Sequence, residues 1–119
     1  SQFPCRTSIF LNPGMTDLDT LKDINPNRVE IYTYDYAKQF FISKKNAISP
    51  ILDLASQLKN SGIHINAGHD LDLNNLNFLV QNVPSLIEVS IGHAFVTDSI
   101  QQGIASTLKD YLKKCVLTK

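Results

Sequence analysis

Two β-branched runs that both stop at Gly-His constrain the fold of this sequence more than any other feature. They cover residues 62–69 and 88–93, and each ends on a histidine, His69 or His93. A short apolar run of this kind is typical of a buried parallel strand, which delivers a titratable side chain and a tight turn to one rim of a sheet. Two strands that end alike therefore predict one shared site at that rim.

Composition places the chain among single globular domains. Its 119 residues are 43% hydrophobic and 18% charged, so we expect one domain over residues 1–119. The 11 Lys and Arg residues balance 11 Asp and Glu residues, which leaves no field to attract nucleic acid or an acidic membrane surface. The apolar runs are too short to cross a bilayer and no signal-peptide pattern is recognisable, so a cytoplasmic location is expected.

The cysteines and histidines predict neither a disulfide framework nor a metal site. Cys5 precedes the first predicted strand and Cys115 lies in the last predicted helix. Two thiols in a cytosolic protein are expected to stay reduced. Neither a Cys-x-x-Cys nor a His-x-x-x-His spacing occurs, so no metal is expected.

The chain reads as strand and helix repeated four times. Strands are predicted over residues 7–11, 28–33, 63–67 and 86–91. After the first strand, Thr16 resembles the N-cap of a short amphipathic helix. The segment 34–46 is interpreted as a loop that becomes helix. Ser49 with Pro50 then predicts the start of a helix that Gly62 closes.

Two further helical segments are expected in the C-terminal part. The first covers residues 74–81 and carries Leu76, Leu79 and Val80 at helical spacing. In the second, Gly103 interrupts the pattern, so we expect a short first segment and a longer final helix. Its apolar positions recur about every fourth residue: Ile100, Ile104, Leu108, Leu112 and Cys115.

Four strand–helix units match half of a (β/α)₈ TIM-type barrel, which has about 250 residues. An open, doubly wound parallel sheet is the structural alternative. Polar residues between aliphatic ones favour the barrel, because strand positions that face covering helices must be apolar. The residues that we expect to form a polar barrel interior are Glu30, Asn66, Glu88 and Ser90.

These motifs resemble the C-terminal half of the pyridoxine 5′-phosphate synthase family. The first two predicted strands of this chain, residues 8–13 and 29–33, are similar to that family's fifth and sixth strands. The resemblance covers nearly the whole chain, and the two Gly-His motifs in this order and spacing are specific. The residues that carry it further are Asn66-Ala67-Gly68-His69, Leu71, Asn75, Pro84, Glu88, Ile91-Gly92-His93-Ala94 and Gly103.

The resemblance implies a TIM barrel that condenses 1-deoxy-D-xylulose 5-phosphate with 3-amino-2-oxopropyl phosphate. The product is pyridoxine 5′-phosphate, in vitamin B6 biosynthesis. By position, the resemblance makes His69 the proton donor, or general acid, and makes Gly92 and His93 a substrate-binding pair. Asp70 stands where the family's glycine contacts the amino-ketone, so Asp70 is expected to meet the substrate. No metal or organic cofactor is implied.

The expected partners are phosphorylated small molecules and a second half of the barrel. The family's general bases lie in its N-terminal half, so we expect that half to be supplied by the same or another chain, or by self-association into a homo-oligomer. Two positions depart from the family pattern, since Tyr34 and Asp70 stand where the family usually has glycine. These departures motivate an alternative, a degenerate half-barrel that binds a phosphorylated metabolite or a partner protein without catalysis.

Structural interpretations stand beside the functional ones. His69 can be a rim histidine bonded to a neighbouring loop, and His93 can be a packed histidine that caps the last helix. His64 begins a strand at the opposite rim and is interpreted as structural. Glu30 and Glu88 can be a hydrogen-bonded layer that fixes barrel register. A different phosphate-handling barrel enzyme is a third hypothesis, because a fold does not determine a function.

Overall fold

The core of the structure is a parallel sheet whose strands follow one another in chain order. We describe it from a computed structural model, over residues 4–15 and 17–117. The sheet has four strands in the order β1-β2-β3-β4, and every neighbouring pair is parallel. The strands are β1 (Ser8–Leu11), β2 (Arg28–Tyr32), β3 (His64–Gly68) and β4 (Leu86–Ser90).

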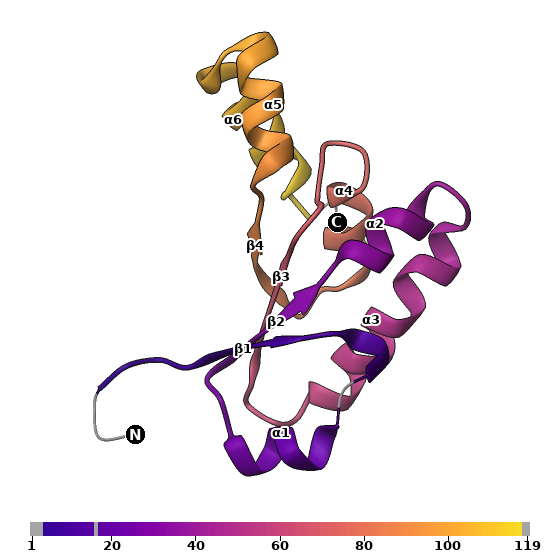
Figure 1. Cartoon of the computed structure of the whole chain (residues 1–119), viewed down its shortest axis with the longest axis vertical. Helices are drawn as coiled ribbons and strands as arrows, with labels where there is room; N and C mark the ends of the chain where they lie inside the picture. Colours follow the sequence, from indigo (N-terminus) through magenta and orange to yellow (C-terminus); the bar gives the residue numbers. More distant parts are fainter. Residues whose placement is uncertain (1–3, 16, 118–119) are drawn as a thin grey trace.

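Helices connect the strands and gather on one side of the sheet. Figure 1 shows α2, α3 and α4 together on that side, while α5 and α6 extend from the end of β4. The helical elements are the 3₁₀ turn η1 (Pro13–Met15), α1 (Leu18–Ile24), α2 (Tyr34–Phe40), α3 (Lys44–Leu58), α4 (Leu76–Asn82), α5 (His93–Gln102) and α6 (Ile104–Lys114).

The hydrophobic core lies between the helices and one face of the sheet. In β2, Val29 and Ile31 are fully buried, whereas the residues that alternate with them are only partly buried. This alternation follows from the geometry of a strand, in which successive side chains point to opposite faces. In α3 the buried residues recur at helical spacing and include Ile51, Leu54, Ala55 and Leu58.

The face of the sheet away from the hydrophobic core carries a row of residues that is polar from β2 to β4. The strand registers align Phe10 with Glu30, Glu30 with Asn66, and Asn66 with Glu88. The Arg28 Nη1 donates to the Glu88 Oε2 over 2.6 Å, which ties β2 to β4 across β3. Glu30, Asn66 and Glu88 therefore share one face of the sheet. Whether this face lines a barrel interior stays a prediction.

The segment before Pro50 is more helical than the sequence analysis expected. Residues 34–40 form α2 and not a loop, because Tyr36 and Phe40, four residues apart, are both buried. Ser43 caps α3 and accepts a hydrogen bond from the Asn46 N–H over 3.4 Å. The prediction that Ser49 caps this helix was therefore wrong, and Pro50 lies inside α3. Burial of Ala47 and Ile48 offsets the backbone bond that proline cannot donate.

The predicted cap of the first helix falls on a position that the structure does not describe. Thr16 lies outside the described residues. Asp17 is the N-cap of α1, and its carboxylate accepts bonds from the Asp19 and Thr20 N–H groups over 3.1 and 3.4 Å. These bonds, with one from the Thr20 hydroxyl, lower the pKa of Asp17. The helix itself is confirmed, but its cap is an aspartate that the sequence analysis overlooked.

Gly103 separates the last two helices as expected, but the predicted apolar stripe is not buried. Figure 1 shows α6 running back beside α5 toward α4. The Asn77 side chain bonds the Lys114 carbonyl over 3.1 Å and so attaches α6 to α4. Tyr111 and Thr107 form the buried side of α6. Cys115, the last residue of the predicted stripe, is partly buried against the core. Seven other apolar residues of α5, α6 and the two positions after Cys115 are exposed, and we name them the α5/α6 apolar stripe: Val96, Ile100, Ile104, Leu108, Leu112, Val116 and Leu117.

Two further features of composition can be checked directly. Cys5 and Cys115 are both free thiols. Within residues 4–15 and 17–117, no helix combines the length and the apolar character that a membrane crossing requires.

Candidate active site

A large cavity lies at the carboxyl ends of β3 and β4. It has a volume of about 880 Å³ and brings together both predicted Gly-His ends. In open and closed parallel sheets alike, ligands bind at the carboxyl ends of the strands. The lining residues are Glu30, His69, Asp70, Leu71, Asp72, Leu73, Asn74, Ser90, Ile91, Gly92, His93, Ala94, Thr97 and Asp98.

Two of the predicted site residues lie outside this cavity. Asn66 and Glu88 line a second hollow of about 480 Å³ on the same side of the sheet, nearer the amino ends of the strands. Glu30 lines both hollows and so connects them. His64, interpreted as structural, is exposed at the start of β3, away from the large cavity. The Asn66 Oδ1 is buried and receives no hydrogen bond from a described residue.

The turn after β3 holds His69 in an uncommon backbone conformation. His69 and Asp70 have φ angles of 84° and 55°, a region that residues other than glycine rarely occupy. The buried Thr33 secures the turn from β2. Its N–H donates to the Gly68 carbonyl over 3.0 Å, and its hydroxyl lies within bonding distance of the Gly68 and His69 carbonyls. The turn is therefore fixed in place by the end of the neighbouring strand.

Asn75 secures the same turn from the opposite side. Its side chain is buried and donates to the Asp70 carbonyl over 3.1 Å. The Tyr36 hydroxyl in turn donates to the Asn75 carbonyl over 2.6 Å. Burial, with the Asp72 carboxylate nearby, raises the pKa of Tyr36 well above its usual range. The Tyr36 hydroxyl therefore stays protonated as a donor, and it links α2 to the loop that carries the site.

The His69 ring has two direct neighbours. Its Nδ1 lies 2.8 Å from the Asp70 Oδ2, and the Tyr32 ring meets it edge-on at 4.8 Å between centroids. About half of the His69 side chain, 48%, remains exposed at the cavity. A carboxylate beside one ring nitrogen leaves the other nitrogen for a ligand. His69 is thus both supported and accessible.

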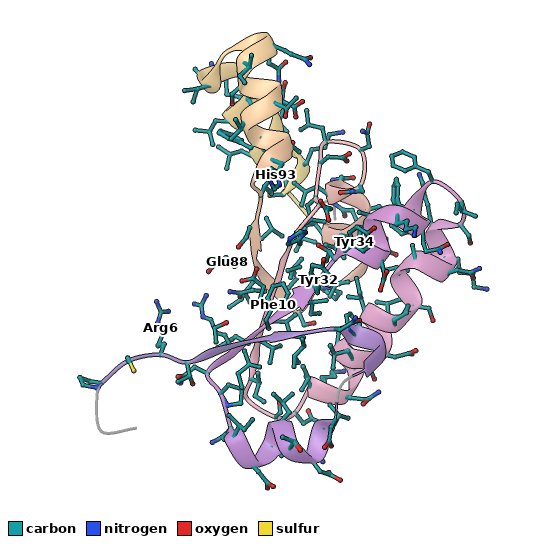
Figure 2. All side chains as sticks on the ribbon, in the orientation of Figure 1. Arg6, Phe10, Tyr32, Tyr34, Glu88 and His93 are labelled. Atoms are coloured by element: carbon teal, nitrogen blue, oxygen red, sulfur yellow. The ribbon has the colours of Figure 1, made fainter. Side chains whose placement is uncertain are left out.

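Tyr34 belongs to an aromatic cluster and does not line the large cavity. Its ring stacks on Tyr32 at 6.0 Å with an interplanar angle of 13°. Phe10 packs on the other side of Tyr32 at 5.3 Å. Figure 2 shows Phe10, Tyr32 and Tyr34 grouped near the middle of the sheet. Tyr34 therefore extends a row of aromatic rings that reaches His69 through Tyr32.

Gly92 and His93 form the other half of the cavity rim. Gly92 precedes α5, and His93 is the first residue of that helix. Figure 2 places His93 where β4 passes into α5. The histidine is exposed, so it is not packed into the helix end as the structural interpretation supposed. An exposed helix start directs backbone N–H groups toward the cavity, where they attract anions.

Several residues of the site were missed by reasoning from the sequence. Tyr32, Thr33 and Asn75 contact or secure the His69 turn, and Thr97 and Asp98 line the cavity from α5. The Tyr111 hydroxyl donates to the Asp98 Oδ2 over 2.8 Å. Burial and this bond raise the pKa of Tyr111 above its usual range. The available signal was the position of Thr33 directly after a strand, at the same rim as the Gly-His ends.

The donor set does not resemble a metal centre. Among residues 4–15 and 17–117, no three His, Cys, Asp or Glu side chains gather closely enough to hold a metal ion. The cavity instead combines two imidazoles, a helix start and carboxylates. Such a set can transfer protons and hold an anion.

Comparison with known proteins identifies the family. The profile described as "Pyridoxal phosphate biosynthesis protein PdxJ" matches residues 1–116. Proteins named pyridoxine 5′-phosphate synthase are similar to this chain. The one from Flavobacterium johnsoniae is 41% identical over 109 residues, which are 92% of this chain and 46% of that protein. The one from Cytophaga hutchinsonii is 42% identical, with the same two shares covered.

A third relative, from Bacteroides fragilis, is 39% identical over 111 residues, with 93% of this chain and 46% of that protein covered. The chain thus spans about half the length of the curated relatives it matches. The family profile nevertheless covers almost every residue, including both Gly-His ends. This chain therefore belongs to the family of the pyridoxal phosphate biosynthesis protein PdxJ.

Proposed function

We propose that the protein is a pyridoxine 5′-phosphate synthase that works in vitamin B6 biosynthesis. In this proposal it condenses 1-deoxy-D-xylulose 5-phosphate with 3-amino-2-oxopropyl phosphate. His69 acts as the general acid, and Gly92 with His93 binds a phosphorylated substrate. The observation that carries the proposal is the single cavity of about 880 Å³ onto which both Gly-His ends open. The relatives' names support the same activity.

His69 suits the acid role because it is both supported and accessible. Ring closure requires protons to be delivered to departing oxygen atoms, and imidazole can give and regain a proton near neutral pH. The ring is 48% exposed at the cavity, while Tyr32 and Asp70 limit its rotation. A proton held on the ring can therefore reach a substrate that occupies the cavity.

The start of α5 suits a phosphate group. The helix runs for ten residues from His93, so its dipole and its first N–H groups favour an anion next to Gly92. Open space surrounds Gly92, since a Cβ placed there would meet no atom within 4 Å. The exposed His93 side chain can add a donor to the same anion.

We further propose that this chain supplies half of a (β/α)₈ barrel. Strands in sequential order, with α2, α3 and α4 together on one side of the sheet, match the winding of a barrel better than a doubly wound sheet. Within the described residues, β1 and β4 each have a strand partner on one side alone. Open strand edges are an aggregation hazard. A second half, from the same chain, another chain or a second copy, would pair both.

The α5/α6 apolar stripe supports the proposal that a second half of the barrel packs against this chain. It includes Ile100, which is 82% exposed, and Ile104, which is 68% exposed. Large contiguous apolar surfaces usually mark a contact with another protein surface. The stripe lies on the two helices that follow β4, the last strand among the described residues. In the proposed barrel, further strands and helices would continue from there.

The test is product formation by the intact protein supplied with both substrates. We expect pyridoxine 5′-phosphate, detected by chromatography and mass spectrometry, and a loss of about 100-fold or more in kcat for His69→Gln. His64→Gln is the matched control, because His64 lies at the opposite rim. Substrate binding without product in the unsubstituted protein would favour the non-catalytic alternative and overturn the proposed activity.

A further inference from the structure

The Asp70 carboxylate lies directly beside the imidazole of His69, the proposed general acid. The Asp70 Oδ2 lies 2.8 Å from the His69 Nδ1, and both side chains line the large cavity. The pair is too exposed to add much to stability, with side-chain exposures of 38% and 48%. We therefore expect the pair to affect the proton transfer chemistry of His69 more than the stability of the fold.

The backbone indicates that the carboxylate has a use. The φ angle of Asp70 is 55°, a conformation that glycine adopts without strain and an L-residue adopts at some cost. Aspartate tolerates this region better than most residues, yet it does not prefer it. Glycine at position 70 would relax the turn, so the Asp70 side chain is expected to contribute something that offsets this strain. We expect that contribution to come from its carboxylate.

The surroundings hold the pair in register. Thr33 and Asn75 bind the carbonyl groups of residues 68–70, so the backbone beneath both side chains is fixed from two sides. The Tyr32 ring lies edge-on against the imidazole at 4.8 Å. With rotation restricted in this way, the Asp70 carboxylate meets the Nδ1 edge and the Nε2 edge is left for the substrate.

We propose that Asp70 is a positioning residue that holds the proton on the His69 Nδ1 and so directs the His69 Nε2 to the substrate. The inference rests on the proposed function and adds a role for a position at which this chain departs from its family. In the charged imidazole both nitrogens carry protons, Asp70 binds the Nδ1–H, and the Nε2–H is given to the departing oxygen. The neutral imidazole that remains keeps its proton on Nδ1, beside the carboxylate.

The decisive measurement is the ring-nitrogen chemical shifts of His69 in the intact protein, with histidine labelled by ¹⁵N. His69→Gln assigns the signal. We expect the neutral ring to carry its proton on Nδ1 in the unsubstituted protein, and on Nε2 in Asp70→Gly. Asp70→Gly also relaxes the turn, so it keeps the fold. Asp35→Asn is the control, because it removes a carboxylate from the exposed first turn of α2.

Kinetics separate positioning from substrate binding. For Asp70→Asn we expect kcat to fall about 10- to 100-fold, with KM changed less than about twofold. An unchanged His69 tautomer in Asp70→Gly, or a raised KM with kcat retained, would overturn the inference. No turnover by the unsubstituted protein would instead count against the proposed function, while the chemical shifts would still report the pairing.

Discussion

At the scale of single residues, Gly68 gives the Glu30 carboxylate the space that it occupies. A Cβ at this position would overlap the Glu30 Oε1 and lie 3.2 Å from the Ser90 Cβ. We expect Gly68→Ala to lower the free energy of unfolding by about 1–3 kcal/mol in urea denaturation. The cost should shrink in a Glu30→Ala background, because the overlapping atoms are then gone.

Gly14→Ala is the matched control, since a Cβ there would meet no atom within 4 Å. Equal costs for Gly68→Ala with and without Glu30 would show that the two residues do not compete for the same space.

Tyr111 gives the protein a dependence on alkaline pH. Burial and the bond to Asp98 raise the pKa of its hydroxyl in the folded state. Above about pH 10 an unfolded tyrosine loses its proton while the folded one keeps it, so the unfolded state binds fewer protons and stability falls as pH rises. We expect Tyr111→Phe to flatten this decline in urea midpoints measured from neutral to alkaline pH. Parallel curves for the two proteins would contradict the assignment.

At the scale of secondary structure, Thr33 connects the end of β2 to the turn after β3. It is fully buried, and its hydroxyl serves the Gly68 and His69 carbonyls. Thr33→Val keeps the shape and removes the hydroxyl, so we expect a loss of about 1–3 kcal/mol in thermal or urea unfolding. We also expect a lower kcat, because the His69 turn is then less well fixed.

Thr107→Val provides the comparison for Thr33. Thr107 is also fully buried, and its hydroxyl donates to the Gly103 carbonyl over 3.0 Å, away from the site. We expect the Thr107→Val protein to lose free energy of unfolding and to keep the kcat of the unsubstituted protein. Equal kcat values for the two variants would show that the Thr33 hydroxyl has no bearing on catalysis.

The positions of the strands and of most helices could be predicted because their signals are local. The four predicted strands and the Leu76, Leu79 and Val80 spacing of α4 are confirmed. The errors lie in α2 and in the start of α3, where proline at position 50 was interpreted as a first helical residue. Tertiary burial of Phe40 and Ile48 decided those boundaries, and propensity alone does not contain that information.

The site was predictable only where a motif marked it. The two Gly-His ends identified the rim, and the structure places both on one cavity. Tyr32 and Asn75 were not assigned to the site, because Tyr32 meets the His69 ring from another strand and Asn75 meets the turn only through the fold of the loop after it. The pairing of Asp70 with its neighbour His69 depends on two unusual φ angles, which no residue pattern announced.

At the scale of the whole molecule, the chain exposes more surface than a compact monomer of its mass. Its accessible area is 7796 Å², against about 6,500 Å² expected for a folded protein of this size. Its radius of gyration is 15.1 Å, against about 13–14 Å. The exposed residues of the α5/α6 apolar stripe contribute to this excess, as the half-barrel proposal expects.

We therefore expect the native protein to occur as a species larger than the 13.3 kDa of this chain. Analytical ultracentrifugation with native mass spectrometry would give the mass of the assembly and of each chain in it. A chain of about twice this mass would place both halves in one polypeptide. An assembly of two 13.3 kDa chains would indicate self-association. A monodisperse, folded monomer of 13.3 kDa would contradict the half-barrel proposal.

The row of aromatic rings beside His69 also has an optical consequence. The sequence contains four tyrosines and no tryptophan. Tyr36 and Tyr111 are buried and hydrogen-bonded, whereas Tyr32 and Tyr34 stack next to the cavity. Tyr32 contacts His69 directly, and Tyr111 donates to Asp98 in the cavity lining. A ligand that enters beside His69 is therefore expected to change the tyrosine emission of this chain, so occupancy of the site can be followed by fluorescence without an attached dye.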